Sequence, residues 1–192
     1  MPMIEGRLAI WREILPPFAV LSLVHPVPIP AGPMSEDFKF EQVMTNISRQ
    51  IQVPYSALQM YALVNDVASY PDFLPWCDAA RVLKVNGNEM DASITLKVGA
   101  LRKAFSTRNA NEPGNRIQVS LLSGPFKSLN GFWSFHDLET GGSVVRLEMS
   151  FEFANRLVDM AIGPVFREIV RNLVGAFQQR AVAVYGPGDR NV

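Results

Sequence analysis

The stretch from Arg156 to Tyr185 constrains the fold more than any other part of this chain. At helical spacing its apolar residues fall on one side and its polar residues on the other, which predicts an amphipathic helix with a wide apolar stripe. A helix of about 30 residues spans roughly 45 Å, because each residue adds 1.5 Å. The apolar stripe therefore needs a large surface to pack against.

The residues before this helix supply such a surface. From Val145 to Phe153 every second residue is apolar, which is the pattern of a half-buried strand. The same kind of pattern predicts further strands at residues 47–53, 79–85, 89–98, 101–109, 117–121 and 129–136. Short turns, such as Asn86-Gly87, connect the later strands, so they are predicted to pair antiparallel. We predict an α+β fold in which a curved antiparallel sheet closes over one long C-terminal helix.

One or two short helices are predicted between the first two strands. Ser56 is the expected N-cap of the first helix. Tyr70 and Leu74 each precede a proline, which pushes both residues towards extended backbone. The loop that ends at Pro75 is therefore expected to be aromatic and rigid.

The N-terminal residues 1–43 differ from the rest because they are rich in proline, which leaves little regular structure. Three interpretations stay open: a disordered tail, a secretory signal, or a start codon placed too early, ahead of Met44. The acidic residues Glu5 and Glu13 weaken the second interpretation. We expect the folded domain at residues 44–186 and a frayed terminus at residues 187–192.

Composition excludes several classes of protein. The formal net charge is zero, which argues against a general polyanion binder. Cys77 is the single cysteine, so no internal disulfide can form. The two histidines are far apart in sequence and no Cys/His cluster has zinc spacing, so we expect no metal site.

Candidates for catalysis are few. Cys77 has no histidine near it in sequence, and we interpret it as a small buried residue rather than a nucleophile. Glu148 and Glu152 share one strand face with Arg146, which is typical of a solvated surface. We therefore expect a protein that is not an enzyme, with a cyclase-like activity as the weaker alternative.

Apolar and aromatic residues concentrate around two turns and one strand. Phe132, Trp133 and Phe135 cannot all face inward on a straight strand, because successive side chains point to opposite faces. A sheet that curves around a helix leaves a cavity between the two, and an apolar cavity suits an isoprenoid tail. We expect the long helix to form one wall of this cavity through Phe166, Ile169 and Val170.

Basic residues gather between residues 81 and 127, where they outnumber acidic ones by eight to three. Such a surface suits rRNA or anionic lipid headgroups, although a solvated sheet exterior gives the same composition. The candidate contact residues for a ribosome or a membrane are Arg102, Lys103, Arg108 and Lys127.

Several motifs resemble one protein family. Leu63-Val-Asn-Asp-Val67, Tyr70-Pro-x-Phe-Leu-Pro75, Phe105-Ser-Thr-Arg-Asn109, Gly124-Pro-Phe-Lys127 and Leu129-x-Gly-x-Trp-x-Phe135 are similar to those of the bacterial ribosome-association toxins and the mitochondrial coenzyme Q-binding START-domain proteins. These form one family in the SRPBCC (START/Bet v 1-like) superfamily, whose fold is the helix grip. The resemblance covers about residues 45–185. One departure from it is Gly163-Pro164, where the family has a residue other than proline after the glycine. This proline should kink or restart the helix.

The resemblance implies two different functions. One is binding of ubiquinone or a similar isoprenoid lipid in support of respiration, with ubiquinone as the ligand and no cofactor. The other is binding of the large ribosomal subunit, which blocks subunit joining. The location expected with either function is cytoplasmic, with peripheral contact to the inner membrane as a further option. The expected ligand-binding residues are Tyr70, Phe73, Leu74, Pro75, Trp76, Phe126, Leu129, Trp133, Phe166, Ile169 and Val170.

Overall fold

The structure is a computed structural model, which describes residues 44–188. Residues 1–43, with the three interpretations given for them, lie outside the described residues. So do residues 189–192 of the predicted frayed terminus. The elements follow the predicted order of one strand, short helices, six strands and a long helix. They are β1 (Thr45–Val53), α1 (Ala57–Asn65), η2 (Val67–Ser69), α2 (Tyr70–Phe73), β2 (Cys77–Asn86), β3 (Glu89–Val98), β4 (Leu101–Glu112), β5 (Arg116–Ser123), β6 (Phe126–Asp137), β7 (Ser143–Phe153) and α3 (Arg156–Tyr185).

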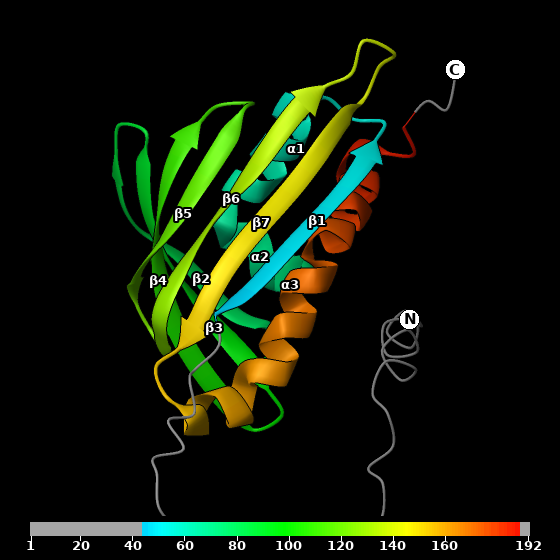
Figure 1. The fold of residues 1–192 in the computed structure, drawn as a ribbon. Coiled ribbons are helices and arrows are strands. Elements are labelled where there is room, and N and C mark those ends of the chain that lie inside the picture. The colour runs from blue at the N-terminus through cyan, green and yellow to red at the C-terminus, as the bar shows by residue number, and fades with distance from the viewer. Residues whose placement is uncertain (1–43, 189–192) are drawn as a thin grey trace, which may run out of the picture. The chain divides into compact units, whose positions relative to one another are not determined.

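The strands form one seven-stranded sheet with the order β1-β7-β6-β5-β4-β3-β2. Every neighbouring pair is antiparallel, as the short connections predicted. The first strand reaches the last one, and Thr45 lies opposite Phe151 in that pairing. The sheet curves, and the helices lie on one side of it (Figure 1).

Helix α1 begins where the sequence predicted. The hydroxyl of Ser56 accepts a hydrogen bond from the Gln59 backbone N–H at 3.2 Å, and the Gln59 side chain accepts one from the Ser56 N–H at 2.9 Å. The next backbone N–H, that of Ala57, donates to the Asp137 carboxylate at 2.6 Å. The carboxylate at the end of β6 therefore fixes the start of α1 against the sheet.

The prediction of extended backbone before both prolines is wrong for Tyr70 and right for Leu74. Tyr70 has φ −54° and ψ −41°, which is helical, whereas Leu74 has φ −101° and ψ 103°. Pro71 lies in the first turn of α2, where a missing N–H costs no intrahelical hydrogen bond. The Tyr70 hydroxyl also donates to the Val64 carbonyl at 2.7 Å, and this buried contact outweighs the local preference of a residue before proline.

Helix α3 continues through Pro164 without a restart. Proline removes the N–H that would bond the carbonyl four residues earlier, and the first turns of α3 lie at an angle to the rest of the helix (Figure 1). Asp159 and Arg167 form an ion pair of 2.6 Å across this region. A Cβ on Gly163 would lie 2.0 Å from the Asp159 carboxylate. The ion pair therefore occupies the space that a side chain at position 163 would need.

Candidate functional site

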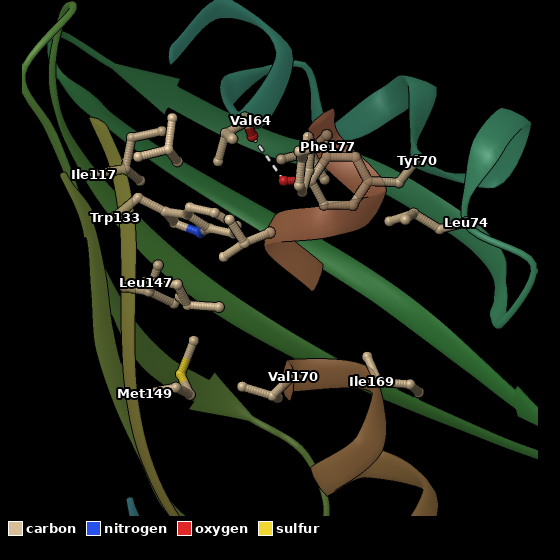
Figure 2. Close-up of a cluster of buried hydrophobic side chains, with 14 of the residues drawn as sticks. Val64, Tyr70, Leu74, Ile117, Trp133, Leu147, Met149, Ile169, Val170 and Phe177 are labelled. Carbon is tan, nitrogen blue, oxygen red and sulfur yellow. Dashed lines mark hydrogen bonds between the residues drawn. The ribbon is translucent and has the colours of Figure 1, made fainter. Parts of the chain in front are cut away.

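A cavity of about 80 Å³ lies between α3 and the sheet. Four residues of α3 form one wall, and strands β3 to β7, the α1–η2 region and the loop before β2 supply the others. Side chains from the sheet, such as Trp133 and Met149, point towards Val170 of α3 (Figure 2). The lining residues are Val64, Val67, Tyr70, Trp76, Ala92, Ile94, Phe105, Thr107, Asn109, Ile117, Val119, Leu129, Trp133, Met149, Phe166, Ile169, Val170 and Leu173.

The cavity wall is almost entirely apolar and carries no charged side chain. The Tyr70 hydroxyl is already committed to the Val64 carbonyl, and burial raises the pKa of Tyr70 above its usual value. Tyr70 is therefore a neutral donor with its hydrogen bond satisfied. Thr107 and Asn109 are the polar side chains that remain, and both are buried.

The structure places seven of the expected ligand-binding residues against the cavity. They are Tyr70, Trp76, Leu129, Trp133, Phe166, Ile169 and Val170. Trp133 and Phe135 face the interior, while Phe132 lies on the opposite face beneath the Arg116 guanidinium, 4.0 Å from the ring centre. This arrangement confirms that the three aromatic residues do not share one face.

The other four expected residues lie elsewhere. Phe73 packs edge to face on Phe177, with ring centres 5.4 Å apart. Leu74 is fully buried in the core and Pro75 is exposed. Phe126 stacks on Phe153, with centres 5.0 Å apart, in an aromatic cluster beside the N-terminal half of α3. The loop before β2 therefore contributes to the cavity through Tyr70 and Trp76 alone, because its other apolar side chains fill the core or face solvent.

Sequence reasoning missed Thr107 and Asn109. Both lie on the face of β4 that also carries Phe105, because side chains alternate along a strand. That spacing was readable in the sequence. Their burial was not, because polar side chains on a strand usually indicate its solvent face.

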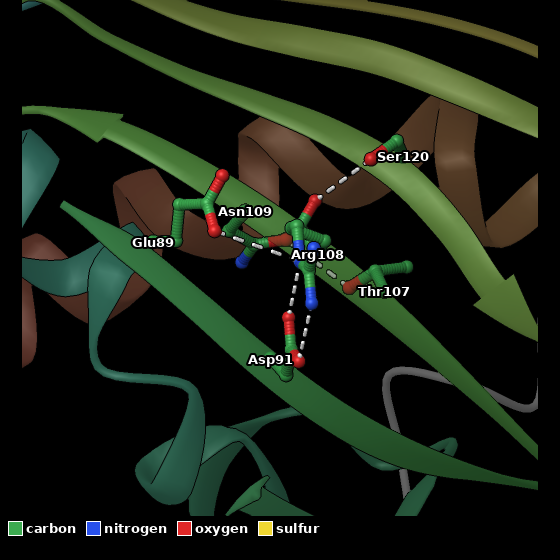
Figure 3. Close-up of polar contacts among 6 residues, drawn as sticks. All are labelled: Glu89, Asp91, Thr107, Arg108, Asn109 and Ser120. Carbon is green, nitrogen blue, oxygen red and sulfur yellow. Dashed lines mark hydrogen bonds and ion pairs between the residues drawn. The ribbon is translucent and has the colours of Figure 1, made fainter. Parts of the chain in front are cut away.

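Three of the four predicted contact residues on the basic surface form local ion pairs. Arg108 holds Asp91 through two hydrogen bonds of 2.8 and 2.9 Å, and Glu89 lies 3.9 Å away (Figure 3). The other two ion-paired residues are Arg102, 2.8 Å from Asp78, and Lys127, 2.9 Å from Glu152. The hydrogen bond from Arg108 lowers the pKa of Asp91 below its usual value. Of the four predicted contact residues, Lys103 alone has no side-chain partner among residues 44–188.

Cys77 lies buried at the start of β2, and its thiol donates to the Ala79 carbonyl at 3.5 Å. Burial raises the pKa of the Cys77 thiol to about 11, and the neighbouring Asp78 charge adds to this effect. A thiol with such a pKa stays protonated near neutral pH. Among the described residues no group of His, Cys, Asp or Glu side chains could hold a metal ion.

The curved sheet closed over a long C-terminal helix, with an apolar cavity between them, defines a helix-grip protein of the START/Bet v 1-like class. The chain belongs to the family described as polyketide cyclase / dehydrase and lipid transport, whose model matches residues 53–178. A START superfamily protein from Mycobacterium smegmatis has the same fold, with a TM-score of 0.61 at 17% identity over 72% of this chain and 98% of that one. An 18 kDa protein from Caulobacter crescentus gives a TM-score of 0.55 at 31% identity, over 75% and 99%.

Three named relatives match this chain at 26–45% identity. The persistence and stress-resistance toxin PasT of Escherichia coli strain CFT073 is 45% identical over 145 residues, which is 76% of this chain and 92% of that protein. The ribosome association toxin RatA of E. coli K12 is 44% identical over the same shares. The mitochondrial coenzyme Q-binding protein COQ10 homolog B of Xenopus laevis is 26% identical over 69% of this chain and 56% of that protein. These matches confirm the family resemblance predicted from the motifs.

Proposed function

We propose that this protein binds ubiquinone or a similar isoprenoid lipid in the cavity between α3 and the sheet and catalyses no reaction on it. The observation that carries this proposal is the composition of the cavity wall, which is apolar, uncharged and built from both layers of the fold. An apolar chain that moves from water into such a site gains about 25 cal/mol for each Å² buried. The name of the Xenopus relative, a coenzyme Q-binding protein, is consistent with this ligand class.

Binding requires the cavity to widen. Its volume of about 80 Å³ is small beside the roughly 300–1,000 Å³ of ligand pockets. Three lining side chains, Trp76, Ile94 and Leu173, are half-buried rather than buried, and they come from the loop before β2, from β3 and from α3. We assign the entrance to these three residues, whose outward movement would admit a prenylated ring.

The test is mass spectrometry of an organic extract of the protein purified without detergent. We expect a co-purified quinone or related isoprenoid lipid. Ubiquinone added to protein freed of lipid should change the fluorescence of Trp76 and Trp133, both of which line the cavity. If the extract holds no lipid and excess ubiquinone leaves the fluorescence unchanged, the proposal is wrong.

The second candidate function is association with the ribosome. The observation that favours it is the 44% identity to a protein named ribosome association toxin over most of both chains. The contact would use the start of β4, where Lys103 is exposed and not ion-paired with any of residues 44–188, although it lies on the strand face that carries Phe105. Because Arg102 and Arg108 already pair with carboxylates, ribosomal phosphates would have to compete for them.

Co-sedimentation with purified ribosomal subunits tests this second candidate. We expect binding to the large subunit at low salt and its loss at high salt, because phosphate contacts are screened by ions. Lys103→Glu should weaken binding, and the combined reversal of Arg102, Lys103 and Arg108 should abolish it. The matched control is Arg49→Glu, which reverses an exposed charge on β1, at the opposite edge of the sheet. Binding that persists through high salt or through the triple reversal would exclude this surface.

A further inference from the structure

The inner face of β4 carries polar side chains where the rest of the cavity wall is apolar. Thr107 and Asn109 follow Phe105 at alternate positions, and all three line the cavity. Asn109 is 7% exposed and Thr107 is 5% exposed, so both side chains are buried. Buried polar groups are normally hydrogen-bonded, and each exception calls for an explanation.

The Asn109 amide is only half satisfied. The Thr107 hydroxyl donates to Asn109 Oδ1 at 3.1 Å (Figure 3), which fixes the orientation of the amide plane. The amide nitrogen, Asn109 Nδ2, has no acceptor among residues 44–188. This nitrogen keeps some accessible surface, and Asn109 lines the cavity.

Trp133 of β6 presents a second donor. Its indole N–H has no acceptor within the described part of the chain, and the ring lines the same cavity. Phe177 meets this ring edge to face at 5.3 Å and Phe135 stacks on it at 6.4 Å, so the ring is held from two sides. Figure 2 shows the indole nitrogen on the edge of the ring that faces the buried cluster. Asn109 and Trp133 therefore contribute unpaired N–H donors to a largely apolar wall.

We infer that Asn109, oriented by Thr107 and joined by the indole N–H of Trp133, hydrogen-bonds a carbonyl oxygen of the bound lipid, so that the cavity selects a quinone over a hydrocarbon of the same shape. This inference rests on the proposed lipid-binding function and names the specificity-determining residue for it. A carbonyl oxygen accepts hydrogen bonds and offers no proton, which matches a site whose free polar atoms are donors. A ligand without an acceptor would bury these donors unpaired, and that penalty is the source of selectivity.

The test compares two probes on four variants. The probes are a ubiquinone with a short prenyl tail and a methylated benzene that carries the same tail and no oxygen. The variants are Asn109→Leu, which keeps the size and removes the amide, Asn109→Asp, which offers acceptors instead, Thr107→Val, and Asn111→Leu. Asn111 is the matched control, because it lies on the same face of β4 and does not line the cavity.

We expect Asn109→Leu and Asn109→Asp to weaken quinone binding by about tenfold, the effect of one lost hydrogen bond. Hydrocarbon binding to Asn109→Leu should be at least as tight as to the wild type, because the variant no longer buries an unpaired amide donor. Thr107→Val, the milder change, should weaken quinone binding by about threefold through the freed amide, and Asn111→Leu should leave the ratio of the two affinities unchanged. The infrared stretch of the quinone carbonyl should shift down in the wild-type complex and return towards its free value in Asn109→Leu.

The possible outcomes distinguish a failure of the Asn109 inference from a failure of the lipid-binding proposal. If wild-type protein binds neither probe, the lipid-binding proposal falls and the inference falls with it. If wild-type protein binds both probes equally well, or Asn109→Leu loses both in the same proportion, the lipid-binding proposal stands and the role of Asn109 is overturned. Should Asn109→Leu fail to fold, the quinone-to-hydrocarbon ratio of Thr107→Val decides: an unchanged ratio overturns the inference.

Discussion

The rings of Trp133 and Phe177 meet edge to face, with their centres 5.3 Å apart. Trp133 belongs to β6 and lines the cavity, whereas Phe177 belongs to α3 and is fully buried behind it. This contact joins the middle of the sheet to the C-terminal half of the helix. The cavity is therefore bounded by side chains that the core already holds in place, and single substitutions in its wall can be tested without removing the contact that positions the helix.

Replacing Val170 by Trp should abolish lipid binding and leave the fold intact. Val170 lines the cavity and is 2% exposed, so a larger side chain there has only the cavity to fill. Overpacking at such a site costs about 1–3 kcal/mol of the free energy of unfolding. Urea unfolding measures the cost, and titration with ubiquinone measures the loss of binding.

The control for this variant is Val182→Trp, which adds the same side chain to an exposed position of the same helix. It should change neither quantity. A folded Val170→Trp protein that still carries a full complement of quinone would show that the ligand lies elsewhere.

Cys77 should be inert towards thiol reagents in the folded protein. Burial raises the pKa of its thiol to about 11, so at pH 8 only about one molecule in a thousand carries the reactive thiolate. We expect labelling by a colorimetric disulfide reagent to be at least about a hundredfold slower in the native protein than in urea. Since Cys77 is the single cysteine, no other thiol contributes to the signal. Rapid labelling of native protein would contradict the buried, protonated state.

The pKa of Asp91 should lie below its usual value and should rise when Arg108 is replaced by Gln. The hydrogen bond from Arg108 favours the charged carboxylate in the folded state. A folded-state pKa that is depressed gives stability that is fully present above the unfolded pKa, about 3.9, and is lost as pH falls through the folded pKa. Carboxyl NMR titration of both proteins measures the change.

Lys84→Gln is the comparison for that experiment, because Lys84 acts on Asp91 only through its charge and more weakly than Arg108 does. It should shift the Asp91 pKa less than Arg108→Gln does. Equal shifts in the two variants would mean that general charge, and not the paired hydrogen bonds, sets this pKa.

A chain that begins at Met44 should melt within a few degrees of the full chain. The buried core of the described structure lies wholly between Ile47 and Ala181, and the family match covers residues 53–178. Truncation tolerance follows from the burial and hydrogen bonding of the segment removed, and every motif of the family resemblance begins after Met44. Thermal unfolding followed by circular dichroism tests this, and a collapse of the melting temperature would show that residues 1–43 support the fold.

Local patterns in the sequence determined the elements and their order. The predicted bounds of β3 and α3 are those of the structure. A clear local signal precedes each element: the turn at Asn86-Gly87 comes before β3, and Asn155 is the N-cap of α3. Alternation along β6 likewise separated Phe132 from Trp133 and Phe135. These features depend on neighbours within a few residues, which the sequence states directly.

Only the tertiary structure decided which of these residues meet across the fold. Asp91 and Arg108 are directly opposite in the β3–β4 register, so a residue predicted to contact phosphate is held instead by a carboxylate. Tyr70 stays helical before a proline because a hydroxyl bond to Val64 holds it there. Thr107 and Asn109 line the cavity because their face of β4 is the one turned towards the interior, together with residues of α3. In a hairpin the turn sets the register, but the curvature of the sheet and the contacts that it creates arise from packing between distant segments, which residue spacing along the chain does not specify.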